Sequence, residues 1–290
     1  MNAAVIMEGV TRSFGKKQVL RGVTGTVAEG RVVGLLGKNG EGKTTLFRIL
    51  LDILRADSGE VRVLDMVPNG SARIRLKVGY VPEQPVFHEF WNVQQSLDFR
   101  SRLFPSWDRE KATKLAHQLD LDLRAQIRGA SKGTLAKAAW ICAVAHDPKL
   151  LLLDEPTSGL DALVRDSVIT NLVGELVKEG KTVFVGNHHM EELSTLLDEV
   201  WLLSEGLIRK KYFMDQIRAN ACRITGRLRS VHATIGNLPV IEECRTGNLV
   251  HWVTLDPKAV EHIRDEAILE SMETEPLSTE KLFRLLMKAV

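Results

Sequence analysis

The sequence predicts an α/β fold built on a mainly parallel sheet, and three observations lead to this prediction. Apolar runs of strand length alternate with helical patterns between Leu150 and Leu203. A cluster of glycines separates the apolar run Val32–Leu36 from a helical pattern. Two carboxylates follow the apolar run Leu150–Leu153, at the carboxyl end of a strand, where such sheets place their ligands.

Length and composition fit an ordinary globular chain. The 290 residues correspond to about two domains, and hydrophobic residues at 44% with charged residues at 26% exclude a disordered or collagen-like chain. The 39 basic and 37 acidic residues leave a formal charge of +2, which is too small to favour nucleic-acid binding. We therefore expect a folded protein without a nucleic-acid partner.

Cysteine spacing and hydropathy indicate the compartment. Cys142, Cys222 and Cys244 are too far apart to form a disulfide framework or a zinc knuckle, which favours a reducing, cytosolic setting. The apolar runs are much shorter than the roughly 18 residues that span a bilayer. The segment Met1–Val10 lacks a basic region followed by a long apolar stretch, so we expect no secretory signal.

The first part of the chain predicts strands and one amphipathic helix. Apolar positions Leu46, Ile49, Leu50 and Ile53 recur at three and four residues, as the buried face of a helix requires. The strands expected around it are Ala4–Val10, Val19–Val27, Val32–Leu36, Gly59–Leu64 and Lys77–Val81.

A helical insertion is expected from Pro85 to about Gly129, where aromatic residues and helical periodicity increase. A further helix begins at the N-cap residue Ser131 and ends before Asp147-Pro148. Its predicted apolar face is Leu135, Ala138, Ala139, Cys142 and Ala145.

Strands and helices alternate in the second half of the chain. The expected strands are Leu150–Leu153, Thr182–Val185 and Val200–Leu203, with helices at about Ala162–Glu179 and from about Met190. After Gly206 the alternation is less regular and indicates a small appended α/β domain. Its expected elements are strands at Ala221–Leu228 and Leu249–Leu255 and helices at Val260–Glu270 and Thr279–Lys288.

The strongest local signal is a complete GxxxxGK[ST] motif between a strand and a helix. Its glycines allow backbone N–H groups to turn toward a triphosphate, Lys43 can reach the β and γ oxygens, and Thr44 can hold Mg²⁺ through its hydroxyl. The alternative is a purely structural role, in which the glycines form a turn at the end of a strand. The predicted ATP-binding residues here are Gly37, Lys38, Asn39, Gly40, Glu41, Gly42, Lys43, Thr44 and Thr45.

Asp154 and Glu155 end the apolar strand and form the second signal. Asp154 can bind Mg²⁺ through water, and Glu155 is placed to act as the general base that polarises a water molecule in line with the γ-phosphate. Without the glycine loop upstream, a solvated acidic turn would explain the pair equally well.

These motifs, with Ser131-Lys132-Gly133-Thr134, Ser158–Asp161 and His188, resemble the ATP-binding subunits of ABC transporters in order and spacing over about residues 4–210. The resemblance implies a P-loop ATPase core with an antiparallel β subdomain, an inserted helical subdomain and a small C-terminal α/β domain. It also implies that Phe14 stacks on adenine, that His188 senses the γ-phosphate, and that Asp161 belongs to the loop facing a second subunit.

The signature segment departs from the family pattern. Ser131 and Gly133 resemble the serine and glycine that meet the γ-phosphate held by the opposite subunit, whereas Lys132 and Thr134 replace the usual glycine and glutamine. The form SKG, together with Ser106-Trp107-Asp108, is similar to ATPases of the ABC-2-type exporter group.

The segment Gly79–Pro82 is followed by Glu83 and only then by Gln84, although the family has glutamine at once. Either side chain is a candidate metal contact, with a plain polar loop as the alternative. His188 and His189 are adjacent and therefore point apart, which argues against a zinc site. The aromatic set Phe87, Phe90, Trp91 and Phe99 resembles the surface that receives a membrane partner.

The expected function is that of an ATP-hydrolysing subunit that binds ATP and Mg²⁺ and drives export through a separate transmembrane subunit at the cytoplasmic face of the membrane. Closure would involve a second ATP-binding subunit, identical or homologous. The expected parts are an ATP-binding core at 1–84 and 148–210, a helical subdomain at 85–147 and an accessory domain at 211–290.

Two other functions fit the same motifs. A soluble ABC-type ATPase acting on ribosomes or DNA is disfavoured by the single cassette and the short stretch from Gln84 to Ser131. A regulatory module with little turnover is disfavoured by the presence of Glu155 and His188, although Thr134 and the shifted glutamine leave it open.

Overall fold

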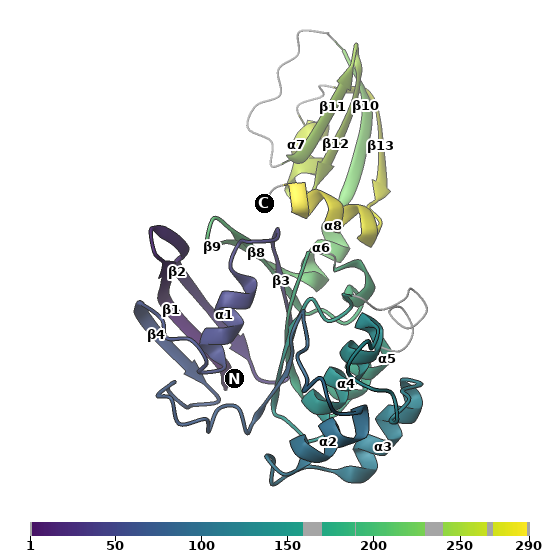
Figure 1. Ribbon diagram of the computed structural model, residues 1–290. Coiled ribbons are helices and arrows are strands. Elements are labelled where there is room, and N and C mark those ends of the chain that lie inside the picture. The colour runs from purple at the N-terminus through teal and green to yellow at the C-terminus, as the bar shows by residue number, and fades with distance from the viewer. Residues whose placement is uncertain (1, 159–169, 189, 230–239, 266–268, 289–290) are drawn as a thin grey trace. The chain divides into compact units, whose positions relative to one another are not determined.

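The computed structural model describes residues 2–158, 170–188, 190–229, 240–265 and 269–288 (Figure 1). The chain divides into two compact units, Met1–Lys211 and Tyr212–Val290, and each is described by itself. In the described residues, no helix combines the length and the apolar character that a membrane crossing needs.

A six-stranded sheet forms the centre of the first unit and confirms the predicted α/β class. Its strands, in spatial order, are β5 (Val78–Val81), β6 (Leu150–Asp154), β7 (Thr182–Asn187), β3 (Val32–Leu36), β8 (Glu199–Ser204) and β9 (Leu207–Phe213). The four contacts from β5 to β8 are all parallel. Every residue of β3, β6 and β7 is buried, as expected for a parallel sheet covered on both faces.

A second, antiparallel sheet consists of β2 (Lys17–Ala28), β1 (Ala3–Phe14) and β4 (Ser58–Val63). Helix α1 (Lys43–Leu50) shares one hydrophobic core with both sheets, in which Phe47 packs edge-on against Phe184 with 5.3 Å between ring centroids. The prediction that Ile53 belongs to the buried helical face was wrong. Helix α1 ends at Leu50, and Ile53 lies beyond it with 58% of its surface exposed.

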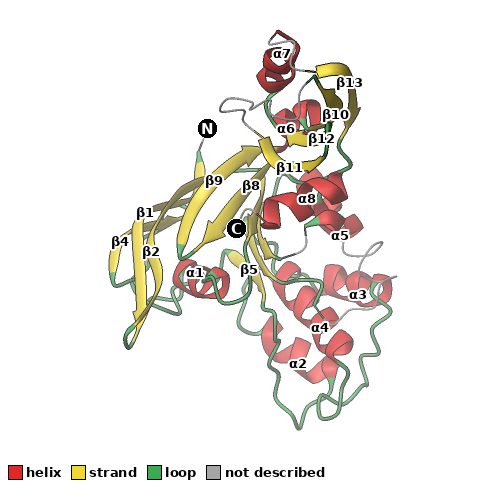
Figure 2. Ribbon diagram, turned by 90° about the horizontal axis from the view of Figure 1, so that it is seen from above, coloured by secondary structure: helices red, strands yellow, loops and turns green. Residues whose placement is uncertain are grey.

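The inserted region contains α2 (Val93–Ser101), α3 (Arg109–Gln118) and α4 (Lys132–Val144), and α5 (Thr170–Lys178) precedes β7. Figure 2 shows α2, α3 and α4 together at one end of the first unit and β1, β2 and β4 at the other. Side chains of Asn92, Asp108 and Ser131 cap the three helices. Ser106 donates through Oγ to the carbonyl of His146 at 2.7 Å, so the Ser106–Asp108 motif joins α3 to the end of α4.

Two predicted helices need comment. The helix expected from Met190 is only the 3₁₀ turn η2 (Glu191–Leu193), which the connection to β8 follows directly. The helix expected at Ala162–Glu179 is described from Thr170 onward, and its predicted first part lies outside the described residues.

The second unit contains a four-stranded antiparallel sheet in the order β11-β12-β10-β13. The connection from β12 through α7 to β13 passes around β10, which is a split β-α-β arrangement. Its own core includes Ile224, Trp252 and Ile263. The elements are α6 (Met214–Asn220), β10 (Cys222–Leu228), β11 (Val240–Thr246), β12 (Leu249–Thr254), α7 (Pro257–Asp265), β13 (Leu269–Pro276) and α8 (Thr279–Lys288).

The prediction of a helix through Glu270 was wrong at its end. Helix α7 ends at Asp265, and Leu269 begins β13, whose pairing with β10 provides backbone hydrogen-bond partners. The sequence also gave no sign of β9, β11 or α6, because their polar, irregular patterns match neither strand nor helix periodicity.

Candidate nucleotide-binding site

The glycine loop joins β3 to α1 at the carboxyl end of the sheet. Gly42 is the N-cap of α1 and has a φ of +107°, and a Cβ there would lie 2.7 Å from Leu20 Cδ2. The positive φ favours glycine at this position, and the first turn of α1 starts at the next residue, Lys43. The amino end of this helix therefore points into the cavity beside the loop, as anion binding requires.

Lys43 is held close to the loop. Its side chain is almost buried, and Nζ donates to the carbonyl of Gly37 at 2.7 Å and to that of Lys38 at 3.3 Å. Nζ also forms an ion pair with Glu155 Oε1 at 3.1 Å. The ammonium group is thus fixed between the glycine loop and the acidic pair at the end of β6.

Asp154 is the last residue of β6 and is 1% exposed. Tyr80 donates through its hydroxyl to Asp154 Oδ2 at 3.3 Å, while Oδ1 is buried without a hydrogen-bond partner among the described residues. Burial raises the pKa of Asp154, and a hydrogen bond from Thr44 opposes that shift. A buried carboxylate oxygen beside a threonine hydroxyl suits Mg²⁺, which prefers oxygen ligands and retains water molecules.

Glu155 follows in a left-handed conformation with a φ of +48°. Few residues other than glycine adopt this conformation, and a hydrogen bond from its N–H to the carbonyl of Gly186 at 2.8 Å holds it. His188 Nδ1 lies 2.7 Å from Oε2, while Oε1 has its ion pair with Lys43. The side chain is therefore oriented by a partner on each oxygen.

A cavity of about 360 Å³ brings these groups together. Phe14 is 49% exposed at its border, where the guanidinium carbon of Arg12 lies 5.0 Å from the ring centroid. The residues that line the cavity are Phe14, Val19, Asn39, Gly40, Gly42, Lys43, Thr44, Thr45, Glu83, Asp154 and Glu155.

Other predicted site residues lie around or outside this cavity. Gly37 and Lys38 contribute carbonyls to Lys43, and Glu41 accepts a hydrogen bond from the backbone N–H of Glu205. Ser131 and Gly133 stand at the start of α4 and do not line the cavity. Asp161 and His189 lie outside the described residues.

The two candidates for metal contact face different cavities. Glu83 lines the cavity of the glycine loop, whereas Gln84 lines a separate cavity of about 320 Å³ with Phe87, Arg100 and His146. Tyr80, which was not among the predicted site residues, lines the second cavity and donates to Asp154. The pairing of β5 with β6 explains this contact, and no sequence pattern indicated it.

The aromatic set of the insertion is only partly exposed. Trp91 packs against His88 and Phe99, with centroid distances of 4.7 and 5.1 Å. Phe90 is 68% exposed, and Phe87 lines the second cavity.

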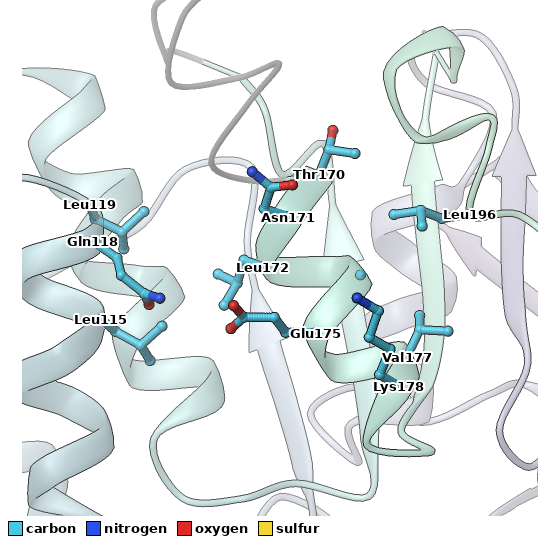
Figure 3. Close-up of a pocket in the computed structure, with 11 residues that line it drawn as sticks. Leu115, Gln118, Leu119, Thr170, Asn171, Leu172, Glu175, Val177, Lys178 and Leu196 are labelled. Carbon is cyan, nitrogen blue, oxygen red and sulfur yellow. The ribbon is translucent and has the colours of Figure 1, made fainter.

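A larger cavity of about 600 Å³ lies elsewhere, between α3 and α5 (Figure 3). Its lining includes Leu115, Thr170 and Leu196 and none of the residues of the glycine loop. One of its lining residues, Thr170, is the first residue that the structure describes after Ser158, and we assign this cavity no site.

The glycine loop, its lysine and the acidic strand end define the class as a P-loop nucleotide-binding protein. The chain matches the ABC transporter family over residues 20–158. It is 35% identical over 211 residues to an uncharacterized ABC transporter ATP-binding protein of Methanocaldococcus jannaschii, covering 71% of this chain and 76% of that protein. The chain belongs to the family of ABC transporter ATP-binding proteins.

Other relatives agree with this placement. The chain is 34% identical to the Nod factor export ATP-binding protein I of Bradyrhizobium diazoefficiens, over 71% of this chain and 69% of that protein. It is 26% identical to the ABC transporter ATP-binding protein YtrB of Bacillus subtilis, over 87% and 86%. These names agree with the transporter function rather than with an ATPase acting on ribosomes or DNA.

Solved structures share the fold. The ATP-binding subunit of an ABC transporter gives a TM-score of 0.68 at 23% identity, covering 74% of this chain and 92% of that chain. A dimeric ATP-binding cassette in a post-hydrolysis state, bound to ADP and Pi, gives 0.65 at 21% identity, over 72% and 98%. The fold and the family make this chain an ATPase subunit of an ABC transporter.

Proposed function

We propose that this chain hydrolyses ATP with Mg²⁺ at the cytoplasmic face of the membrane and thereby drives export through a separate transmembrane subunit. One observation carries the proposal: Lys43, Asp154 and Glu155 converge on one cavity at the carboxyl end of a parallel sheet. Export is the direction favoured by similarity to the Nod factor export protein.

ATP binding uses the loop and its helix. Backbone N–H groups of the glycine loop and the amino end of α1 attract the phosphates, and Lys43 neutralises the β and γ oxygens. Phe14, half exposed at the border of the cavity, offers a flat surface on which adenine stacks.

Thr44 and Asp154 would hold Mg²⁺, because Asp154 Oδ1 is a buried oxygen without a partner in the described part of the chain. The ion would supply positive charge against the phosphate oxygens. Asp154 remains oriented by the hydroxyl of Tyr80.

Glu155 accepts the proton of the attacking water as the reaction proceeds. His188 Nδ1 lies within hydrogen-bond distance of Oε2, and Lys43 attracts Oε1 through an ion pair without a hydrogen bond, so the carboxylate is positioned before substrate arrives. His188 lies beside this carboxylate and is therefore close enough to the reacting water to respond to the γ-phosphate.

A second ATP-binding subunit completes the site. The amino end of α4, with Ser131 and Gly133, presents a helix terminus and a hydroxyl that suit a triphosphate on the opposite subunit, and Asp161 joins this trans contact. ATP binds the closed pair more tightly than the open one, so hydrolysis reopens it.

The insertion receives the transmembrane subunit. The cavity of about 320 Å³ combines the apolar side chains of Phe87 and Phe104 with the cation of Arg100, which suits an apolar segment that carries an acidic group. We assign the ATP-binding core to 1–84 and 148–210, the helical subdomain to 85–147 and the accessory domain to 211–290.

The substitution Glu155→Gln tests this function. It removes the proton acceptor but keeps a side chain of the same shape, so ATP hydrolysis should fall by at least about a hundredfold while ATP binding persists. Light scattering of the variant with and without Mg-ATP should show an ATP-dependent dimer.

Lys43→Ala is the paired variant and should weaken nucleotide binding itself, because the ammonium group no longer meets the phosphates. Retained hydrolysis in Glu155→Gln would remove Glu155 from its role. Unchanged nucleotide affinity in Lys43→Ala would contradict the site as a whole.

A further inference from the structure

Two consecutive residues after β5 face two different cavities. Glu83 lines the nucleotide cavity, and Gln84 lines the cavity with Phe87 and Arg100. The residue presented to the nucleotide is therefore a carboxylate, and the neutral amide lies on the other side.

Glu83 adds a third acidic side chain to a cavity that already holds Asp154 and Glu155. Burial raises the pKa of Asp154, and the charges of Glu155 and then Glu83 add to this shift. Burial and Asp154 raise the pKa of Tyr80, with a smaller contribution from Glu83. The ammonium group of Lys43 forms its ion pair with Glu155.

The acidic groups do not form a cation site by themselves. Among the described residues, no group of three or more His, Cys, Asp or Glu side chains is placed to hold a metal ion. Asp154 nevertheless lines this cavity, and its Oδ1 is buried without a hydrogen-bond partner in that part of the chain. An ion that binds here must bring further oxygen ligands with it, and phosphate oxygens are such ligands.

We propose that Glu83 makes nucleotide binding by this chain dependent on a divalent cation. The inference rests on the proposed ATP site. A metal-free triphosphate meets the negative charge of Glu83 and is repelled, whereas a metal-bound triphosphate presents positive charge to the same carboxylate and is attracted. Glu83 therefore weakens the binding of metal-free nucleotide and strengthens the binding of metal-bound nucleotide.

The quantity to measure is the ratio of two dissociation constants for a fluorescent ATP analogue, the Kd in EDTA divided by the Kd in Mg²⁺. Coupling between two bound species is typically 5- to 150-fold. We expect Glu83→Gln to lower the ratio about tenfold, through tighter binding in EDTA and weaker binding in Mg²⁺.

Two further variants make the test specific to position. The exchange Glu83→Gln/Gln84→Glu keeps the net charge of the chain but moves the carboxylate to the other cavity, and it should lower the ratio as Glu83→Gln does. Glu89→Gln removes an exposed carboxylate of the same segment that does not line the nucleotide cavity, and it should retain the wild-type ratio.

The outcomes separate this inference from the proposed function. A wild-type ratio in Glu83→Gln or in the exchange variant overturns the role of Glu83 while nucleotide binding stands. Absence of nucleotide binding by the wild-type chain, in EDTA and in Mg²⁺ alike, overturns the proposed site itself.

Discussion

His146 is a buried imidazole next to the end of α4, and its environment keeps it neutral. It stacks on Phe104 with 4.2 Å between ring centroids, and its Nδ1 has no hydrogen-bond partner among the described residues. Burial lowers the pKa of His146 to about 4, with Arg100 adding to the shift and Asp147 opposing it. The neutral imidazole thus acts as a packing residue, stacked on Phe104 of the insertion.

This histidine predicts a loss of stability in mild acid. In the unfolded chain, His146 has its ordinary pKa of 6.5. Between pH 6.5 and about 4, the unfolded state therefore binds a proton at His146 that the folded state does not bind. The free energy of unfolding should fall with pH across this window, by about 3 kcal/mol in total from this group. Urea denaturation at a series of pH values measures it.

His146→Gln is the matched variant, because it keeps a polar side chain but does not titrate. Its stability should change less between pH 6.5 and 4 than that of the wild type. Parallel pH profiles for the two chains would show that His146 does not cause the acid sensitivity.

Sequence patterns predicted which residues carry the chemistry better than they predicted which way the side chains of these residues point. The motif spacing predicted Lys43 and Asp154 in one site because a parallel sheet brings the ends of its strands to one edge, and both line one cavity. It could not distinguish Glu83 from Gln84, because side chains in a loop point where tertiary packing allows. The hydroxyl of Tyr80 was missed because its contact with Asp154 depends on the pairing of β5 with β6, which the sequence patterns did not predict.

At the scale of elements, the start of α4 has a structural role as a helix cap and the functional role that we propose for Ser131 at the second subunit. Ser131 Oγ accepts a hydrogen bond from the backbone N–H of Thr134 at 3.0 Å and lies 2.8 Å from Thr134 Oγ1. Thr134, which departs from the family signature, is thus part of the cap.

Ser131→Ala should lower the free energy of unfolding by about 1 kcal/mol, because an N-cap bond is lost. Ser131→Asp keeps a capping oxygen and should cost less stability, but it places a negative charge before the triphosphate of the opposite subunit. In the Glu155→Gln background, we expect Ser131→Asp to prevent the ATP-dependent dimer. Thermal denaturation and light scattering separate the two effects.

Should Ser131→Asp dimerise with ATP as the parent does, the trans contact would not run through this position. Equal stability of Ser131→Ala and wild type would mean that Thr134 or solvent replaces the cap.

Elements with a strong hydrophobic period were predicted well. Elements whose formation depends on tertiary contacts, such as pairing with a neighbouring strand, were not. The buried runs Val32–Leu36 and Leu150–Leu153 lie within β3 and β6. Strand β13 has the sequence LESMETEP, which no strand alternation predicts, and it forms at the sheet edge because β10 supplies its partners. After Met190, the chain reaches β8 by a 3₁₀ turn, although its local sequence allows a helix.

At the scale of the whole molecule, each of the two units has its own hydrophobic core. All residues that line the nucleotide cavity lie between Phe14 and Glu155. A chain ending at Phe213 keeps the whole of β9, and we expect it to fold and to bind the fluorescent ATP analogue with a Kd within about threefold of the full chain, because no cavity contact is removed.

Circular dichroism during heating gives the control for that shortened chain, which should still unfold cooperatively. A folded but non-binding product would show that residues after Phe213 support the nucleotide site, against the independence of the two units.

Gly79, in the middle of β5, has a mechanical consequence. A Cβ at this position would lie 2.2 Å from the carbonyl oxygen of Ala143, so the backbone of β5 presses directly on that of α4. Packed backbones without intervening side chains leave no room to slide. We therefore expect a displacement of the carboxyl end of α4 to shift β5, and with it Glu83 and Gln84, which follow β5. Even alanine at position 79 should force the two backbones apart and weaken this coupling between α4 and the segment after β5.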